Sequence, residues 1–67
     1  MIEIVVNGEV RQAPDNGHLL DMLRHLEIDP SRVAIELDRQ IVRKSDWERT
    51  PVRAGAQLEI VQFVGGG

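Results

Sequence analysis

The stretch HLLDMLRHLEI, residues 18–28, decides which fold this chain can adopt. Its apolar residues recur at the spacing i, i+3, i+4 and i+7, at Leu19, Met22, Leu23 and Leu26. This spacing places them on one face of an amphipathic α-helix, and that face must be buried against another layer of the protein. We expect Asn16 or Gly17 to cap the start of the helix. The pair Asp29-Pro30 should stop it, because the residue before a proline avoids the α conformation.

Segments typical of β-strands lie on both sides of this helix, since apolar and polar residues alternate in them. The strand-like segments are 1–6, 9–13, 32–37, 40–44 and 57–64. Asn7-Gly8 predicts a hairpin with a type I′ turn between the first two. Asp38-Arg39 predicts a second tight turn, and Gly55 a third.

The segment SDWERTP, residues 45–51, predicts one short turn of helix before the last strand. Ser45 is placed to cap it, with Glu48 three residues later in the position of a capping box. Trp47 is expected to anchor this short helix to the sheet.

The order strand, strand, helix, strand, strand, short helix, strand predicts an α+β domain. A single main helix packed across one face of a mixed sheet of about five strands is the β-grasp arrangement. A right-handed crossover is the natural way to join the first hairpin to the later strands over the helix. We expect the domain to occupy residues 1–64 and a flexible glycine tail to occupy residues 65–67.

Composition argues against several classes of function. The 67 residues carry a formal net charge of −3 and no basic stripe, which disfavours general nucleic-acid binding. No apolar run approaches the roughly 20 residues that span a bilayer, and no signal-peptide pattern begins the sequence, so we expect a cytoplasmic protein. The sequence has no cysteine, and His18 and His25 lack a third metal ligand. No catalytic set such as Ser-His-Asp can be assembled.

Charge is distributed unevenly along the chain. Residues 1–38 contain eight acidic and three basic residues, whereas residues 39–67 contain three acidic and five basic residues. The second half could therefore help to dock an acidic partner, or the bias could reflect only solvated faces.

The last predicted strand has two distinct faces. If Leu58 and Ile60 point toward the helix, Val61 and Phe63 point away from it on the other face of the sheet. Two adjacent exposed apolar side chains indicate a contact patch for a partner, to which we add Val64. Alternatively, a loop or the short helix covers them.

The sequence closes on Gly65, Gly66 and Gly67 directly after this strand. Such an end could be disordered or a cloning remnant, or it could act as a passive spacer. A third interpretation is chemical. Glycines let a tail thread through a channel too narrow for side chains, and the Gly67 carboxylate would be unhindered. A carboxylate reacts with nucleophiles only after a partner converts it to an acyl phosphate or adenylate.

The whole chain resembles the ThiS family of sulfur-carrier proteins, ubiquitin-like carriers of thiazole formation in thiamin biosynthesis. The resemblance covers the opening strand with its Asn-Gly turn, LLDMLRHL, VAIEL, and IVRKSDWERTPVRAGAQLEIVQFVGGG. Each motif is weak alone, and their order, spacing and terminal placement together are specific. Ala56 departs from the family, which often has aspartate after the turn glycine, and this difference concerns the turn rather than the tail.

The resemblance implies a carrier that performs no catalysis itself. A ThiF-like adenylating enzyme, using ATP and Mg²⁺, would activate the Gly67 carboxylate. A cysteine desulfurase or similar sulfur donor would displace AMP to leave a thiocarboxylate, and a ThiG-like thiazole synthase would receive the sulfur. The carrier itself would bind no cofactor. Because the sequence has no cysteine, the sulfur can be attached only at the backbone C-terminus.

Three other functions stay open at this point. The same chemistry could serve another acceptor, as in the small subunit of molybdopterin synthase. The chain could be a ubiquitin-like modifier joined to lysines through Gly67. It could also be a β-grasp interaction domain with an inert tail.

Overall fold

The structure is a computed structural model that describes residues 1–63. The predicted tail residues Gly65, Gly66 and Gly67, together with Val64, lie outside the described residues. The elements in chain order are β1 (Ile2–Val6), β2 (Glu9–Ala13), α1 (Leu19–His25), the 3-10 helix η1 (Pro30–Arg32), β3 (Val33–Leu37), β4 (Gln40–Val42), the 3-10 helix η2 (Lys44–Arg49) and β5 (Gln57–Gln62).

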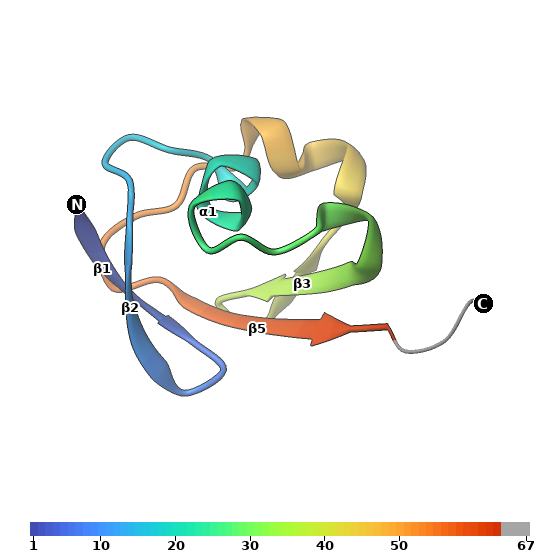
Figure 1. The fold of residues 1–67 in the computed structure, drawn as a ribbon, viewed down its shortest axis with the longest axis horizontal. Coiled ribbons are helices and arrows are strands. Elements are labelled where there is room, and N and C mark those ends of the chain that lie inside the picture. The colour runs from blue at the N-terminus through green and yellow to red at the C-terminus, as the bar shows by residue number, and fades with distance from the viewer. Residues whose placement is uncertain (64–67) are drawn as a thin grey trace.

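The strands form one sheet in the order β2-β1-β5-β3-β4, with the last strand in the centre (Figure 1). β5 runs parallel to β1, with Val5 opposite Gln57 and Val6 opposite Leu58. The other three pairings are antiparallel. This is the predicted α+β, β-grasp arrangement of a mixed sheet with one main helix, and the prediction is confirmed.

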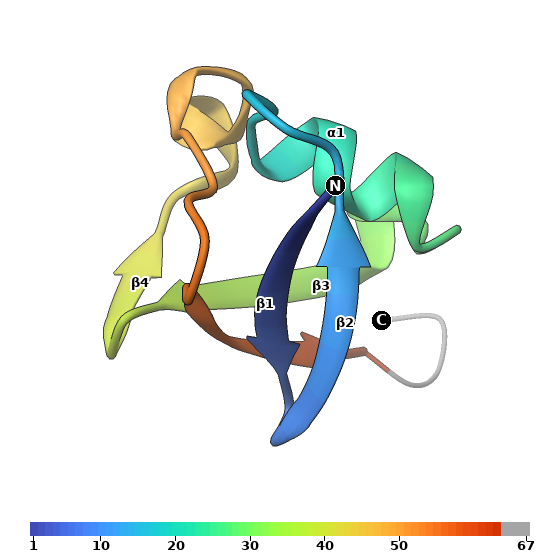
Figure 2. The same cartoon turned by 90° about the vertical axis from the view of Figure 1, so that its left-hand side faces the viewer.

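The helices lie together on one side of the sheet, as two perpendicular views show (Figures 1 and 2). The core fills the space between α1, η2 and this side of the sheet. Its buried apolar residues are Ile4, Val6, Ala13, Leu19, Met22, Leu23, Val33, Ile35, Trp47, Val52, Ala56 and Leu58. Leu26, predicted as the fourth residue of the buried helix stripe, is only half-buried, because it follows the last helical residue.

Trp47 fixes η2 over the sheet. Its side chain is buried, and its indole Nε1 donates a hydrogen bond of 2.8 Å to the carbonyl oxygen of Val42 at the end of β4. A buried indole needs a partner for its single donor, and the strand end supplies it. The predicted anchoring role of Trp47 is confirmed.

Both predicted hairpin turns have positive φ at their two central residues, as a type I′ turn requires. The values are 50° at Asn7 and 82° at Gly8, and 48° at Asp38 and 71° at Arg39. The second turn adopts this conformation without glycine. Asp38 compensates by clamping β5, since its carboxylate accepts a hydrogen bond of 3.0 Å from the backbone N–H of Gln57.

The start of α1 differs from the prediction. The helix begins at Leu19 and its N-cap is His18, whereas Asn16 or Gly17 was expected. The backbone N–H of His18 donates a 2.7 Å hydrogen bond to Oδ2 of Asp21 in the first turn. This hydrogen bond lowers the pKa of Asp21, and it satisfies a donor that would otherwise lack a helical partner.

The end of α1 also differs, because the helix ends at His25, before the proline expected to stop it. Glu27 takes a positive φ of 59°. The backbone N–H of Ile28 then donates to the carbonyl oxygen of Leu23 at 2.9 Å, and that of Glu27 donates to Arg24 at 3.1 Å. These two bonds form a Schellman motif, which closes the helix with a non-glycine residue in the left-handed position.

The start of η2 corrects a third expectation. Its N-cap is Arg43, and Ser45, expected to cap it together with Glu48, lies inside the helix. The turn begins earlier because the backbone N–H of Asp46 donates to the carbonyl oxygen of Arg43 at 2.8 Å. β4 consequently stops at Val42 instead of extending through residue 44.

Candidate functional site

The two faces of β5 have the environments predicted from the sequence. Leu58 is 2% exposed and Ile60 is half-buried, both on the side of α1. Val61 and Phe63 lie on the opposite side and are 61% and 56% exposed. Neither η2 nor a loop of residues 1–63 covers them, so the alternative of a covering loop is wrong. Their role in docking a partner stays a prediction.

These residues belong to a larger surface, the side of the sheet away from the helices, which we call the open face. Strand pairing places Val10 beside Val5, Ala34 beside Val61, and Glu36 between Ile41 and Glu59. Val10 and Ile41 are 61% and 80% exposed. Several large apolar side chains therefore share one uncovered surface, which is typical of a protein-binding site.

The side chain of Asn7 holds β5 beyond the end of β1. The backbone N–H of Asn7 donates to the carbonyl oxygen of Leu58 at 2.8 Å, where the regular pairing of the two strands ends. Its side-chain amide then makes two bonds to Ile60: Nδ2 donates to the carbonyl oxygen at 3.1 Å, and Oδ1 accepts from the backbone N–H at 2.7 Å. The side-chain amide thus makes the two bonds to β5 that the backbone of a further β1 residue would make in a parallel pairing.

On the other edge of β5, hydrogen bonding continues to Phe63, the last described residue, which follows the strand. The backbone N–H of Phe63 donates to the carbonyl oxygen of Arg32 at 2.8 Å, one step beyond the pairing of Val33 with Gln62. Phe63 is therefore held against the residue that precedes β3, directly after the end of β5. Sequence reasoning assigned Asn7 only to its turn and missed this role, because a turn asparagine carries no signal of a distant partner.

Two glutamates form the cross-strand pair next to that of Val61 on the same face. Glu36 and Glu59 lie directly opposite each other on β3 and β5. The basic residues of the second half lie mainly outside the strands, in the turn after β3 and around η2. One of them, Arg49, forms an ion pair with Asp46 at 3.1 Å. Arg39, in the turn after β3, borders the same hollow as the two glutamates, and the docking of an acidic partner stays a prediction.

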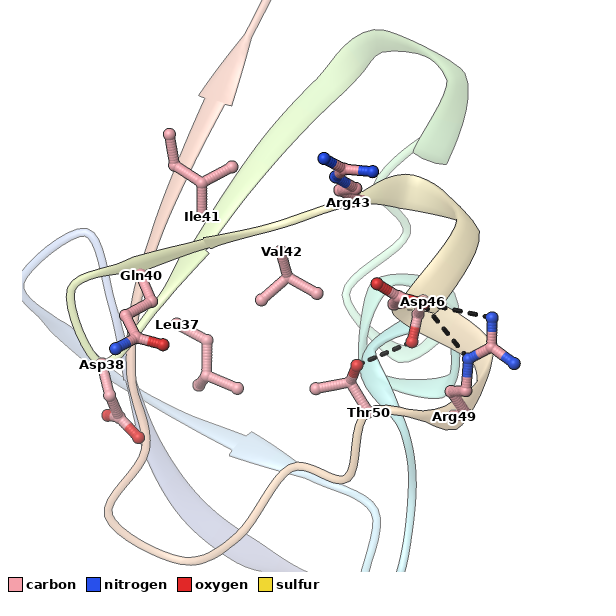
Figure 3. Close-up of a pocket in the computed structure, with 9 residues that line it drawn as sticks. All are labelled: Leu37, Asp38, Gln40, Ile41, Val42, Arg43, Asp46, Arg49 and Thr50. Atoms are coloured by element: carbon pink, nitrogen blue, oxygen red, sulfur yellow. Dashed lines mark hydrogen bonds and ion pairs between the residues drawn. The ribbon is translucent and has the colours of Figure 1, made fainter.

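A hollow of about 780 Å³ lies between β4 and η2 (Figure 3). Three of its polar residues already bond to one another: Arg49 contacts the Asp46 carboxylate, and Thr50 Oγ1 donates to the Asp46 carbonyl oxygen at 2.6 Å. Figure 3 also shows Ile41 on the opposite side of β4 from Val42 and Leu37, toward the open face. The arrangement does not indicate a particular ligand.

Neither histidine joins a cluster of potential ligands. His25 is exposed, and Nδ1 of His18 lies 3.3 Å from the Asp21 carboxylate. Among residues 1–63, no three side chains of His, Cys, Asp or Glu gather as metal ligands would. In the same part of the chain, no helix is both long enough and apolar enough to cross a membrane.

A protein-family model matches nearly the whole chain, including its closing segment. The model of the ThiS family matches residues 4–67. The chain belongs to the ThiS family. The resemblance drawn from the sequence motifs is thereby confirmed, and the match extends through the three closing glycines.

Individual relatives of this ThiS-family chain carry two kinds of name. It is 30% identical over 63 residues to the sulfur carrier protein ThiS of Bacillus subtilis, across 92% of this chain and 96% of that protein. It is 38% identical over 66 residues to the thiazole synthase of Paramagnetospirillum magneticum, across 98% of this chain and 20% of that protein. The chain thus spans about a fifth of the length of that thiazole synthase.

A solved structure supports the fold independently. The crystal structure of the thiamine biosynthesis protein ThiS from Geobacter metallireducens superposes with a TM-score of 0.83. The likeness covers 98% of this chain and 100% of the other, at 23% sequence identity. At this identity the likeness establishes the shared β-grasp fold.

We predict that Asn7→Gly destabilises the domain by about 1–3 kcal/mol, because it removes both side-chain bonds to Ile60 while glycine tolerates the positive φ. Hydrogen exchange at the Ile60 amide should accelerate more than exchange elsewhere in the sheet. Asn16→Gly is the matched control, since Asn16 also has positive φ, 57°, and no side-chain hydrogen bond among residues 1–63. Equal losses of stability in the two variants, measured by urea unfolding, would show that the clamp contributes nothing.

Proposed function

We propose that this chain is a sulfur carrier for thiazole formation in thiamin biosynthesis, and that it carries sulfur as a thiocarboxylate on Gly67. The observation that carries the proposal is the ThiS family match, which runs to Gly67 itself. The Bacillus subtilis relative of matching length bears the name sulfur carrier protein. Relatives named thiazole synthase favour thiazole over another sulfur acceptor.

The proposed chemistry has two steps at the carboxyl group. A carboxylate oxygen of Gly67 attacks the α-phosphorus of ATP, pyrophosphate leaves, and an acyl adenylate forms. The terminal sulfur of a donor persulfide then attacks the acyl carbon, and the C–O bond to AMP breaks as the C–S bond forms. A second thiol of the donor system next attacks the inner sulfur of the resulting acyl disulfide; the S–S bond breaks, the thiocarboxylate leaves, and the two donor thiols end as a disulfide. The adenylating enzyme, ThiF-like, supplies the ATP and Mg²⁺ site, and a cysteine desulfurase or similar donor supplies the sulfur.

The chain itself contributes delivery and recognition, not catalysis. The domain, residues 1–64, presents Val61, Phe63 and Val64 to the partner, and Gly65 and Gly66 thread toward its active site. With no cysteine in the sequence, the chain has no thiol to compete for the sulfur. A ThiG-like thiazole synthase then takes the sulfur from the thiocarboxylate. Because activation consumes ATP, we place the carrier in the cytoplasm.

The hydrogen bonds that hold β5 near its end support a carrier that positions its carboxylate and leaves catalysis to the partner. Asn7 and Arg32 hold the two edges of β5 close to its end, so Phe63, the last described residue, has a defined position relative to Val61. A partner that binds the open face would therefore meet Phe63 at a constant distance from its docking surface. Positioning of this kind lowers the entropic cost of bringing the carboxylate to the reacting nucleotide.

The sulfur-carrying role predicts a specific mass change. After incubation with ATP, the adenylating enzyme and a sulfur source, intact-protein mass spectrometry should show one terminal oxygen replaced by sulfur. Deletion of Gly67 should abolish this change, because the carboxylate then falls about 3.5 Å short of its position, while the melting temperature stays unchanged.

Two results would contradict the proposed function. Conjugates of high mass would indicate a protein modifier instead. The undeleted chain could also stay unmodified by an adenylating enzyme that does activate its own carrier protein. That result would exclude both the sulfur-carrier role and the modifier role. Sulfur transfer to the deletion variant would show that the length of the tail does not matter.

Docking on the open face predicts that Val61→Ser and Phe63→Ser each weaken binding to the adenylating enzyme about tenfold, since each removes an apolar contact at the interface. Their free energies of unfolding should change by less than about 0.5 kcal/mol, because both side chains are exposed. His25→Ser is the control: His25 is exposed, but it lies on α1, on the helical side of the sheet. Isothermal titration calorimetry and urea unfolding measure the two quantities. A large loss of stability with unchanged binding would show that these residues are structural.

A further inference from the structure

The centre of the open face holds two carboxylates that repel each other. Glu36 on β3 and Glu59 on β5 are directly opposite in the antiparallel pairing. Cross-strand neighbours of this kind have Cβ atoms about 5 Å apart, and like charges in that position destabilise a sheet. A sequence selected only for stability would place an opposite charge or a polar pair there.

The described chain supplies no close cation to this pair. No ion pair within residues 1–63 involves either glutamate. Arg39 lines the same hollow as the two glutamates, yet its nitrogen atoms lie more than 4.0 Å from their carboxylate oxygens. Glu36 is half-buried and Glu59 is exposed, so both carboxylates have access to solvent.

Apolar side chains border the pair on two sides. Ile41, 80% exposed, is the cross-strand neighbour of Glu36, and Val61 follows two residues after Glu59 on the same face. A partner that buries Ile41 and Val61 must therefore remove water from both carboxylates. Desolvation of two like charges is strongly unfavourable unless the partner provides a cation with hydrogen-bond donors.

We propose that the partner surface that covers the open face is apolar with a basic centre, and that it places an arginine between Glu36 and Glu59. A guanidinium fits because its planar set of five donors can bond two carboxylates at once, which a lysine ammonium does less well. This inference rests on the proposed function, which makes the adenylating enzyme the protein that first acts on the chain. It specifies the chemistry by which that enzyme recognises the carrier.

The same charge pair argues against a second copy of this chain as the occupant. Two open faces packed together would bring four carboxylates into one interface. The chain's net charge of −3 adds to that repulsion. The glutamates would thus keep free carriers apart while they favour a basic partner.

The inference predicts opposite effects on stability and on binding. Glu36→Gln or Glu59→Gln should raise the melting temperature by about 1–4 °C, because either change removes the repulsion, and the double variant should gain little more. Each single variant should bind the adenylating enzyme about tenfold more weakly at low ionic strength. Glu59→Lys should be the most stable and the weakest binder. The difference in Kd between wild type and variants should shrink at about 1 M salt.

The test measures melting temperature and the Kd for the purified ThiF-like adenylating enzyme by calorimetry, with Glu48→Gln as control. Glu48 is an exposed residue of η2 with no ion pair in residues 1–63, and its replacement should change neither quantity appreciably. Unchanged or tighter binding of the glutamine variants would overturn the inference, as would a lower melting temperature, which would mean that Arg39 already stabilises the pair. Suppose that the glutamine variants overturn the inference, but Val61→Ser weakens binding and the wild type accepts sulfur. The proposed function then stands without the inference. Failure of the wild type to bind or accept sulfur would remove both.

Discussion

The parallel pairing of β5 with β1 is the constraint on which the rest of this structure depends. The backbone N–H of Val5 bonds to the carbonyl oxygen of Ala56 at 2.9 Å, and that of Asn7 bonds to Leu58 at 2.8 Å. These contacts join the first strand of the chain to the last. Parallel neighbours need a long crossover, and α1 with the β3–β4 hairpin occupies it. The last strand consequently lies in the centre of the sheet, between β1 and β3.

Because β5 is central, one of its faces belongs to the core and the other belongs to the open face. Through Leu58 its inner face completes the core beneath α1, and through Val61 its outer face forms the middle of the open face. A strand at the edge of the sheet could fray without exposing the core, but a central strand is held on both sides. Phe63, which follows β5, is therefore held in place beside the surface that we propose to bind the partner. The stability of the core and the position of Phe63 depend on the same pairing.

The sequence predicted those features that local pattern determines. The spacing of Leu19, Met22 and Leu23 located the helix and its buried face, and alternation in β5 assigned Leu58 to the core and Val61 to the surface. Asn7-Gly8 gave the first turn. Each of these results follows from residues that are neighbours in the chain, so no knowledge of the rest of the fold was needed.

The features that the sequence missed depend on contacts between distant segments. α1 begins at its observed position partly because the backbone N–H of Leu19 bonds to the carbonyl oxygen of Thr50 at 3.0 Å. The role of Asn7 requires Ile60 beside it, 53 residues away. The opposition of Glu36 and Glu59 depends on the register of β3 against β5, which alternation alone does not fix. The charge count of each half of the chain likewise gave no information about which face would carry the charge.

The central claim is that the open face around β5, and not the helical side, is the surface by which the partner recognises this ThiS-family chain. The most direct measurement is an NMR titration of the ¹⁵N-labelled chain with the adenylating enzyme. The account predicts that the largest changes in amide signals fall on β5 and β3, at Glu59, Val61 and Glu36, while those of α1 stay nearly unchanged. Changes concentrated on α1 and η2, with β5 unaffected, would contradict it.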